Sequence, residues 1–371
     1  MSEPRGRMNR WALSLSGGML LVSGALALTG QIDLAAAGFL LVFVLLLIGM
    51  WRHRILHGFM FTVWVLTAVV VAILYPESLT QMGGFNTEIL IVPLIQVIMF
   101  GMGTAMSLGD FAGVLRMPKG VFVGLGCQFT IMPVLAVTLV WLAGFPPEVG
   151  AGILLIGCSP SGVSSNVMAF ISKGNLALSV TLTACATLLA PLVTPFLMVL
   201  LADRLVPIEF LSMMVSILKM IILPVVLGLV FHHLFKGKMR WLHEAMPLVA
   251  MAANVLIIGI IVAAGRDHLL SIGLLLLVVA ILHNAAGYVL GYWGCRWSGM
   301  DKRDSRTIAF EVGMQNGGMA AGIASEMGRA ATMGLFPAVF GTWMDVSGSM
   351  LANWWRERSP DDSTKDAVSE K

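Results

Sequence analysis

Apolar segments long enough to cross a lipid bilayer follow one another along nearly the whole chain. Charged residues make up only 12% of its 371 positions, whereas a soluble domain carries about 25%. A membrane-spanning helix needs about 17–25 mainly apolar residues. We predict twelve such helices, near residues 12–30, 34–50, 56–75, 89–107, 120–144, 149–173, 175–202, 209–235, 243–265, 269–297, 303–326 and 331–355. The chain is therefore expected to be an all-α polytopic membrane protein.

The basic residues predict the orientation of these helices. With the N-terminus in the cytoplasm, the cytoplasmic segments hold nineteen Lys and Arg residues, and the opposite loops hold only Arg204, Arg266 and Arg329. Lys219 lies inside a predicted span. This asymmetry satisfies the positive-inside rule. We therefore expect a multi-pass protein with both termini in the cytoplasm. The net charge of +3 follows from this topology, so it is no indication of nucleic-acid binding.

Two polar stretches that contain glycine interrupt predicted spans. The first, GCSPSGVSSN, runs from Gly157 to Asn166, and the second, EVGMQNGG, runs from Glu311 to Gly318. An interrupted helix frees backbone groups that lipid cannot satisfy, so protein or a water-filled cavity must surround it. Paired interruptions at matching places in two halves of a chain are typical of the binding site of a secondary transporter. The two stretches therefore predict an ion and substrate site.

The interruptions also indicate how the chain is divided. Residues 55–203 and 204–356 each hold five predicted spans, and the fourth span of each set is the interrupted one. An odd number of spans reverses orientation, so we predict two inverted five-helix repeats around a site near the membrane midplane. Residues 1–54 are expected to form a cytoplasmic segment with two extra transmembrane helices. Residues 357–371 are expected to form a cytoplasmic tail.

Glu311 is an acid deep within an otherwise apolar or small-residue span. Inserting a carboxylate there costs about 2.5–3.5 kcal/mol, so an unpaired structural role is not expected. One reading is that Glu311 is neutralised, by an ion pair with Lys219 or by a proton. The other is that it binds a cation or carries protons. Hard cations prefer oxygen ligands, and the residues near the interruptions that could supply them are Val312 and Met314 through their carbonyls, and Gln315, Ser165, Asn166, Ser179 and Thr183.

Three other polar positions lie within predicted spans. Gln128 is a lone amide, so it either joins two helices through a hydrogen bond or belongs to the site. Asp345 is a second buried acid, and beside an anionic substrate it would repel the substrate unless it were protonated or paired. Proton coupling, or a zwitterionic or neutral substrate, would resolve that conflict. The pair His283 and Asn284 is expected to make packing hydrogen bonds.

The sequence contains no P-loop and no nucleophile elbow, so we expect no enzyme.

Several motifs together indicate a family. They are MFGMG at 99–103, Asp110-Phe111, GCSP at 157–160, SNVM at 165–168, KGNLALSV at 173–180, EVGMQN at 311–316 and SGSMLA at 347–352. With these motifs the chain resembles the bile acid:sodium symporter family, in particular its ten-span bacterial members, over roughly residues 57–356. The resemblance implies a bacterial inner or plasma membrane. It also implies a six-helix core domain, a four-helix panel domain, and two interrupted helices that cross.

The resemblance implies two sodium ions as the only bound cofactors. One ion would be held by Ser165, Asn166, Ser179, Thr183 and Glu311, and the other by Gln128, Val312, Met314, Gln315 and Glu311. The substrate would bind between core and panel, near Asn316, Gly317, Asp345 and Ser161. Departures from the family pattern gather on this substrate side. They are Ser161, Val163 and Ser164 where relatives often have Gly, Thr and Ala, Gly317 where Ser is frequent, and Asp345 where close relatives often have Asn.

These observations together predict a sodium-coupled symporter of a small organic anion that works by alternating access. A proton-coupled or facilitative carrier of organic acids with the same fold is the main alternative. A membrane sensor or assembly scaffold without transport is a further alternative, and it would tolerate loss of the cation ligands. A channel is disfavoured because the polar groups gather at one depth instead of lining a path. The sequence names neither the substrate nor the oligomeric state.

Overall fold

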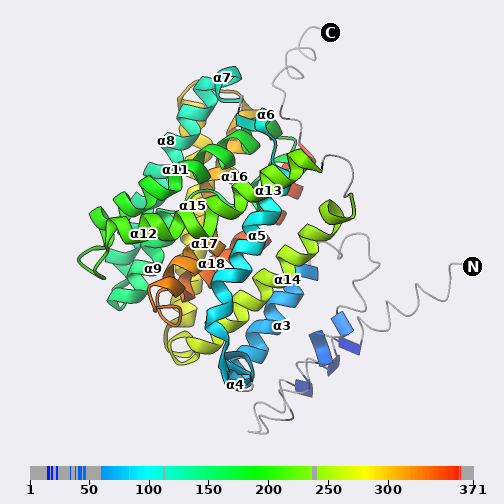
Figure 1. The fold of residues 1–371 in the computed structure, drawn as a ribbon, viewed down its shortest axis with the longest axis vertical. Helices are drawn as coiled ribbons and strands as arrows, with labels where there is room; N and C mark the ends of the chain where they lie inside the picture. Colours follow the sequence, from blue (N-terminus) through cyan, green and yellow to red (C-terminus); the bar gives the residue numbers. More distant parts are fainter. Residues whose placement is uncertain are drawn as a thin grey trace, which may run out of the picture.

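The structure is a computed structural model that describes residues 60–82, 84–111, 113–235, 240–358 and 360, with scattered positions between residues 15 and 46. The extra spans predicted at 12–30 and 34–50, and nearly all of the tail predicted at 357–371, lie outside these described residues. The described part is almost entirely helical (Figure 1). A pair of two-residue antiparallel strands, β1 (Gln81–Met82) and β2 (Phe85–Asn86), is the only sheet in it.

The long helices follow the predicted spans within a few residues. The first half contains α3 (Met60–Leu74), α5 (Ile91–Ala105), α8 (Pro118–Ala143), α9 (Pro147–Gly157), α10 (Ser164–Ile171) and α11 (Leu176–Ala202). Its connections hold α4 (Pro76–Thr80), η2 (Thr87–Leu90), α6 (Leu108–Phe111) and α7 (Gly113–Arg116). The second half contains α12 (Phe210–Ile217), the π-helical turn η3 (Leu218–Ile222), α13 (Leu223–Leu234), α14 (Arg240–Ala264), α15 (Arg266–Trp297), α16 (Lys302–Gly313), α17 (Gly317–Glu326) and α18 (Leu335–Arg356).

Six helical segments of the described chain are long and apolar enough to cross a membrane. They are Thr87–Ala105, Pro118–Ala143, Leu176–Ala202, Phe210–Leu234, Ala245–Ala264 and Arg266–Trp297. They confirm an all-α polytopic membrane protein. In both halves the interrupted helix is the fourth segment of five, as α9 and α10 in the first half and α16 and α17 in the second. The total of twelve spans, the inverted repeats and the domain boundaries stay predictions.

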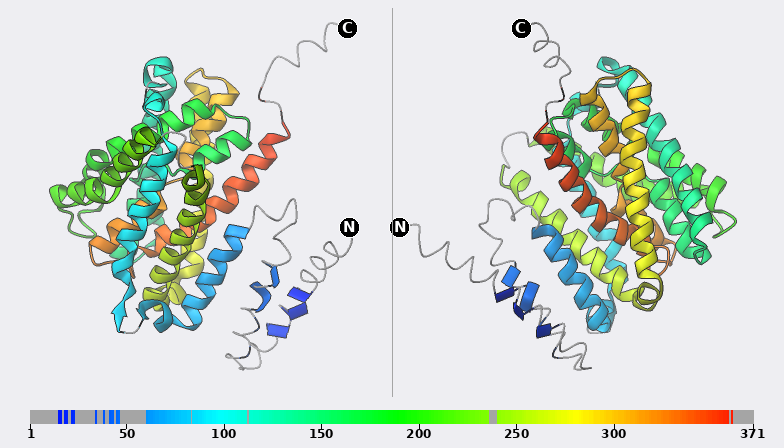
Figure 2. Two further views of the ribbon diagram at one scale, coloured as in Figure 1. Left: turned by 45° about the vertical axis from the view of Figure 1, so that its right-hand side comes forward. Right: turned by 180° about the vertical axis from the view of Figure 1, so that it is seen from behind.

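The helices form two groups that differ in their neighbours. In one group α5 packs against α13 and α14, and α14 packs against α3 (Figures 1 and 2). Gly103 and Gly228 allow α5 and α13 to touch through their backbones, since a Cβ on Gly103 would lie 2.1 Å from the Val225 carbonyl oxygen. In the other group α15 packs against α8, α16 and α18, and α11 packs against α8 and α16. The division into a panel and a core that the resemblance implies stays a prediction.

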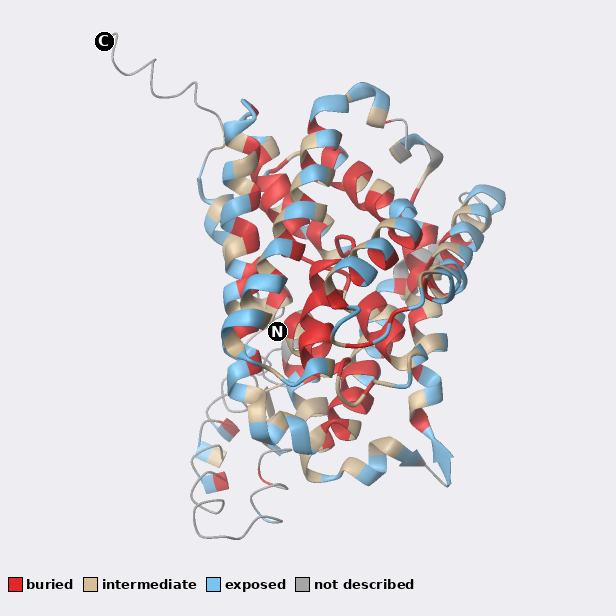
Figure 3. Ribbon diagram, turned by 90° about the vertical axis from the view of Figure 1, so that its left-hand side faces the viewer, coloured by how far each residue is buried: buried red, intermediate tan, exposed pale blue. Residues whose placement is uncertain are grey.

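The first halves of the two interrupted helices lie in the centre of the second group. Every residue of α9 from Val149 to Gly157 is buried, and so is every residue of α16 from Ser305 to Gly313. Figure 3 shows that buried residues, drawn in red, gather in the interior of the helical body. Such a location means that the polar side chains of α16 must find their partners within the protein.

Candidate functional site

The two interruptions cross and pair through their backbones. Gly162 N–H donates to the Met314 carbonyl at 2.9 Å, and Asn316 N–H donates to the Pro160 carbonyl at 2.8 Å. Ser161 and Gln315 form an antiparallel bridge at the crossing. Each interruption therefore satisfies backbone groups that the other one frees, which is the requirement for irregular backbone at membrane depth. The predicted crossing of the two helices is confirmed.

Glu311 lies beside this crossing within a cluster of oxygen atoms. Its Oε1 accepts hydrogen bonds from Ser165 Oγ at 2.6 Å and Ser179 Oγ at 2.5 Å, and Thr183 Oγ1 lies 3.0 Å from its Oε2. Thr183 Oγ1 also lies 3.2 Å from Asn166 Oδ1. The structure thus brings together all five side chains of the first predicted sodium site. The three hydroxyl groups have one hydrogen each, whereas the carboxylate, the amide oxygen and the hydroxyl oxygens together can accept more than three. Such a surplus of acceptor oxygens favours a hard cation.

The second predicted group contains two buried amides, Gln128 on α8 and Gln315 just after α16. Gln128 Nε2 donates to Gln315 Oε1 at 2.8 Å and to the Ser159 carbonyl at 2.9 Å. Gln315 Nε2 donates in turn to the Val312 carbonyl at 2.5 Å. Gln128 therefore does join α8 to the crossing by hydrogen bonds, and the amide that it contacts belongs to the predicted site. The Met314 carbonyl is the one that accepts from Gly162, so it also lies at the crossing.

Local sequence explains how these groups are held in place. The side chain of Asn175 caps the start of α11 by accepting from Leu178 N–H at 3.2 Å, and Asp301 caps α16 by accepting from Asp304 N–H at 2.7 Å. Ser, Thr, Asn and Asp are the preferred residues at this position because their side chains satisfy a free N–H of the first turn. Beyond the α11 cap, the spacing of four between Ser179 and Thr183 puts both hydroxyls on one face of α11.

The end of α16 depends on contacts that the sequence did not reveal. A Cβ on Gly313 would lie 2.2 Å from the ring of Tyr288, so α15 and α16 meet there without room for a side chain. Asn284 Nδ2 donates to the Gly313 carbonyl at 2.8 Å, and Asn284 Oδ1 accepts from Ser347 Oγ at 2.6 Å. Asn284, predicted only to make packing hydrogen bonds, satisfies a carbonyl beside the interruption. Its one sequence signal was a polar side chain in a long apolar helix.

Two further polar predictions can be placed. His283 is buried, and its Nε2 lies 3.1 Å from the Met132 carbonyl oxygen, as a packing hydrogen bond requires. Lys219 lies in the turn η3 with an exposed side chain, and its backbone carbonyl accepts from Gln96. The partners of Glu311 are hydroxyl groups, so the structure shows no Glu311–Lys219 ion pair among the described residues.

A small cavity of about 40 Å³ lies between α14, the first turn of α17 and α18. Two of the four predicted substrate residues, Gly317 and Asp345, line it, together with Asn254, Gly318 and Gly341. The side chain oxygen Asp345 Oδ1 is buried and has no hydrogen-bond partner in the described part of the chain. The cavity lies where one helix of the first group meets two of the second.

The other two predicted substrate residues do not line this cavity. Asn316 Oδ1 accepts from Met319 N–H at 2.9 Å, so its side chain caps α17. Ser161 is 1% exposed and belongs to the crossing. Its buried hydroxyl lies beside the carboxyl of Glu311.

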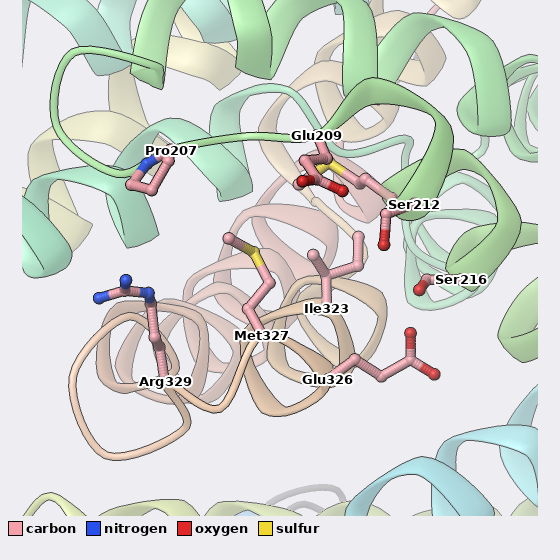
Figure 4. A pocket seen from close by; sticks show the side chains of 9 residues that line it. Pro207, Glu209, Ser212, Ser216, Ile323, Glu326, Met327 and Arg329 are labelled. Carbon is pink, nitrogen blue, oxygen red and sulfur yellow. The ribbon is translucent and has the colours of Figure 1, made fainter.

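A second cavity, of about 300 Å³, opens between α12 and the end of α17 and was not anticipated from the sequence. Figure 4 shows Glu209 and Ser212 on one side of it and Ile323 and Met327 on the other. Arg329, also at this cavity, forms an ion pair with Glu148 in the first turn of α9. The ion pair joins the end of one interrupted helix to the start of the other.

Comparison with known proteins places this architecture among transporters. The family model described as "Sodium Bile acid symporter family" matches residues 92–290, more than half of the chain. A Bacillus subtilis (strain 168) protein named "Uncharacterized sodium-dependent transporter YocS" is 38% identical over 302 residues, which cover 81% of this chain and 92% of that protein. "Probable sodium/metabolite cotransporter BASS1, chloroplastic" of Arabidopsis thaliana is 31% identical over 300 residues, covering 81% of this chain and 74% of that protein.

A third relative, "Probable sodium/metabolite cotransporter BASS2, chloroplastic" of Oryza sativa subsp. japonica, is 32% identical over 312 residues. The match covers 84% of this chain and 73% of that protein. The family match contains α9 and α10, which form the first interrupted helix, and it ends before α16. The chain therefore belongs to the sodium bile acid symporter family.

Proposed function

We propose that the protein is a sodium-coupled symporter of a small organic substrate with an anionic group, and that it works by alternating access in a bacterial inner or plasma membrane. The observation that carries this proposal is the Glu311 carboxylate at the crossing of two interrupted helices, within 3.0 Å of hydroxyls from α10 and α11. The printed names of the relatives support sodium as the coupling ion. None of these features calls for an enzymatic reaction.

Sodium would bind at two places that share Glu311. The first set of ligands is Ser165, Asn166, Ser179, Thr183 and Glu311, and the second is Gln128, Val312, Met314, Gln315 and Glu311. The first set supplies carboxylate, amide and hydroxyl oxygens, and the second supplies carboxylate, amide and backbone carbonyl oxygens; all of these are ligands of hard cations. Because each ion would sit against the same carboxylate, binding of one would change the charge that the other meets. Sodium binding would also connect α10, α11 and α16 more tightly.

The substrate would bind in the cavity that Gly317 and Asp345 line, between the four-helix and six-helix groups. The larger cavity at Glu209 and Ser212 also lies between α12 and α17, on the side predicted to face away from the cytoplasm. It would give water, sodium and substrate a route toward the crossing. Movement of one group against the other would then exchange access between the two sides of the membrane.

The energetics support concentrative transport. Two sodium ions moving with a monoanion carry one net positive charge, worth about 2.3 kcal/mol per 100 mV. A tenfold sodium gradient adds about 1.4 kcal/mol per ion. The total of about 5 kcal/mol is enough for roughly thousandfold accumulation.

Thermal stability of the purified protein in sodium, potassium and choline chloride at equal ionic strength tests the proposal without knowledge of the substrate. A ligand that binds the folded state raises the melting temperature. We expect a rise in sodium only. Equal melting temperatures in the three salts would contradict sodium coupling. The proton-coupled alternative rests on the unpaired oxygen of Asp345, and it would then be tested through the pH dependence of uptake in Asp345→Asn.

A further inference from the structure

The cavity between α14, α17 and α18 combines two groups of opposite electrostatic character. The first turn of α17 offers backbone N–H groups, and Asp345 on α18 offers a carboxylate. We propose that the transported substrate is a small zwitterion, with a carboxylate that faces the start of α17 and a protonated amine that faces Asp345. This inference rests on the proposed function because it names the substrate class of that same site.

The start of α17 is suited to the negative end of such a substrate. Gly317 N–H donates to the Gln315 carbonyl at 2.9 Å, and Met319 N–H donates to the Asn316 side chain at 2.9 Å. The Gly318 N–H takes part in neither of these bonds, so it is available to a group in the cavity. Gly317 and Gly318 both line this cavity, and neither has a side chain that would fill it. The N-terminus of a helix carries a partial positive charge that stabilises anions. α17 has ten residues, so the effect of its aligned peptide dipoles is present.

Asp345 is suited to the positive end. Its Oδ1 is buried without a partner among the described residues. The hydroxyl of Ser164 is the polar side chain beside this carboxyl, and no Lys or Arg lines the cavity. A buried carboxylate without a cation is costly, and pairing with an ammonium group removes much of that cost. A substrate that carries only a negative charge would instead add repulsion at this place.

The remaining walls limit the size of the substrate. Ile257, Ile258 and Ile261 of α14 form the apolar side, and Asn254 adds one amide. Gly341 leaves open space, since a Cβ built there would meet nothing within 4 Å. With a volume of about 40 Å³, the cavity has no room for a large amphipathic anion, so it favours a short substrate.

Matched ligand pairs test the inference. Melting temperature is measured in sodium chloride with L-alanine, β-alanine and γ-aminobutyrate, and with propionate and butyrate, which lack the amine. We expect the amino compounds to raise the melting temperature and the simple carboxylates to have no effect. In Asp345→Asn the amino compounds should bind at least about tenfold more weakly, because a charge-assisted hydrogen bond is lost. Glu77→Gln, which neutralises an exposed acid on α4, should keep the binding of the wild type.

Charge movement gives a second test that needs no variant. In proteoliposomes, sodium uptake and current are measured together during transport of the amino compound that gives the largest stabilisation. A zwitterion adds no net charge, so the number of charges moved should equal the number of sodium ions moved. Fewer charges than sodium ions would overturn the inference, as would simple carboxylates that bind the wild type as tightly as their amino counterparts.

The outcomes separate this inference from the proposed function. Lack of any sodium-selective stabilisation without substrate would contradict sodium coupling itself. Sodium-selective stabilisation without a response to the amino compounds would overturn only the zwitterion. Simple carboxylates that bind the wild type more tightly at low pH, but bind Asp345→Asn at all pH values, would assign Asp345 to proton binding and would also overturn the zwitterion.

Discussion

Replacement of Glu311 by glutamine tests whether one carboxylate serves both proposed sodium sites. The change keeps the size of the side chain and removes its charge. Ser165 Oγ and Ser179 Oγ lie 2.6 and 2.5 Å from Glu311 Oε1, distances typical of hydrogen bonds to an ionised oxygen. The glutamine oxygen can still accept from one or both of these hydroxyls. We therefore expect Glu311→Gln to fold and to lose the stabilisation by sodium.

The size of the expected effect follows from binding linkage. At a sodium concentration ten times the dissociation constant, each site stabilises the folded state by about 1.4 kcal/mol, and two sites by about 2.8 kcal/mol. The entropy of unfolding is about 2.1 cal/mol/K per residue, or about 0.6 kcal/mol/K for roughly 300 ordered residues. The melting temperature should therefore rise by about 4 °C in sodium for the wild type, and by less than about 1 °C for Glu311→Gln.

The assay compares melting temperatures in sodium, potassium and choline chloride for the wild type, Glu311→Gln and Glu77→Gln. Glu77 is an exposed acid on α4, so its variant controls for the loss of one negative charge. Glu77→Gln should keep the full sodium effect. Ser165→Ala removes a ligand of one site only, and it should keep part of the effect. If Glu311→Gln kept the full sodium-selective rise, the assignment of Glu311 to both sites would be refuted.

Three other substitutions test separate parts of the structure. Gly341→Ala, whose Cβ would meet nothing within 4 Å, should reduce substrate uptake and keep the sodium-dependent rise in melting temperature. The control Gly126→Ala on α8, whose Cβ also meets nothing, should leave both quantities unchanged. Equal uptake by the two variants would contradict the proposed location of the substrate. Gly103→Ala should lower the melting temperature in every salt by several degrees, because its Cβ would lie 2.1 Å from the Val225 carbonyl oxygen. An unchanged melting temperature would show that α5 and α13 can separate freely. Asn284→Leu should weaken sodium binding several-fold more than Asn284→Gln, because leucine leaves the carbonyl at the end of α16 without its 2.8 Å donor, whereas glutamine keeps an amide N–H. Equal sodium affinities would reduce Asn284 to a packing role.

The sequence predicted the helices well because bilayer length and apolar composition specify them locally. The structural boundaries of α8, α11 and α15, for example, lie within three residues of the predicted spans. The two interruptions were also visible, since Pro160, Gly162 and Gly313 stand among polar residues in otherwise apolar segments. These signals are local, so they require no knowledge of the neighbouring helices.

The contacts between distant segments could not be predicted in the same way. Residue chemistry left two readings for Gln128, and its hydrogen bond to Gln315 joins positions 187 residues apart. The ion pair between Glu148 and Arg329 and the cavity beside it depend on where the loops of two halves meet. Neither partner is unusual in its own segment. Their pairing follows from tertiary packing, which a periodic pattern does not encode.

The crossing explains why one place in the molecule can combine structural and ion-binding roles. Gly162 and Asn316 donate across the crossing, so the freed backbone is largely satisfied by protein and does not depend on an ion. The hydroxyls around Glu311 are different, because each can rotate its hydrogen toward the carboxylate or away from it. A cation bound to the same oxygens would compete with those hydrogens and turn them toward other acceptors. For Ser165 such an acceptor is available in the Gly162 carbonyl at 2.7 Å. The backbone can therefore stay fixed while this hydroxyl changes partners, so we expect sodium affinity to depend on this acceptor as well as on the ligands themselves.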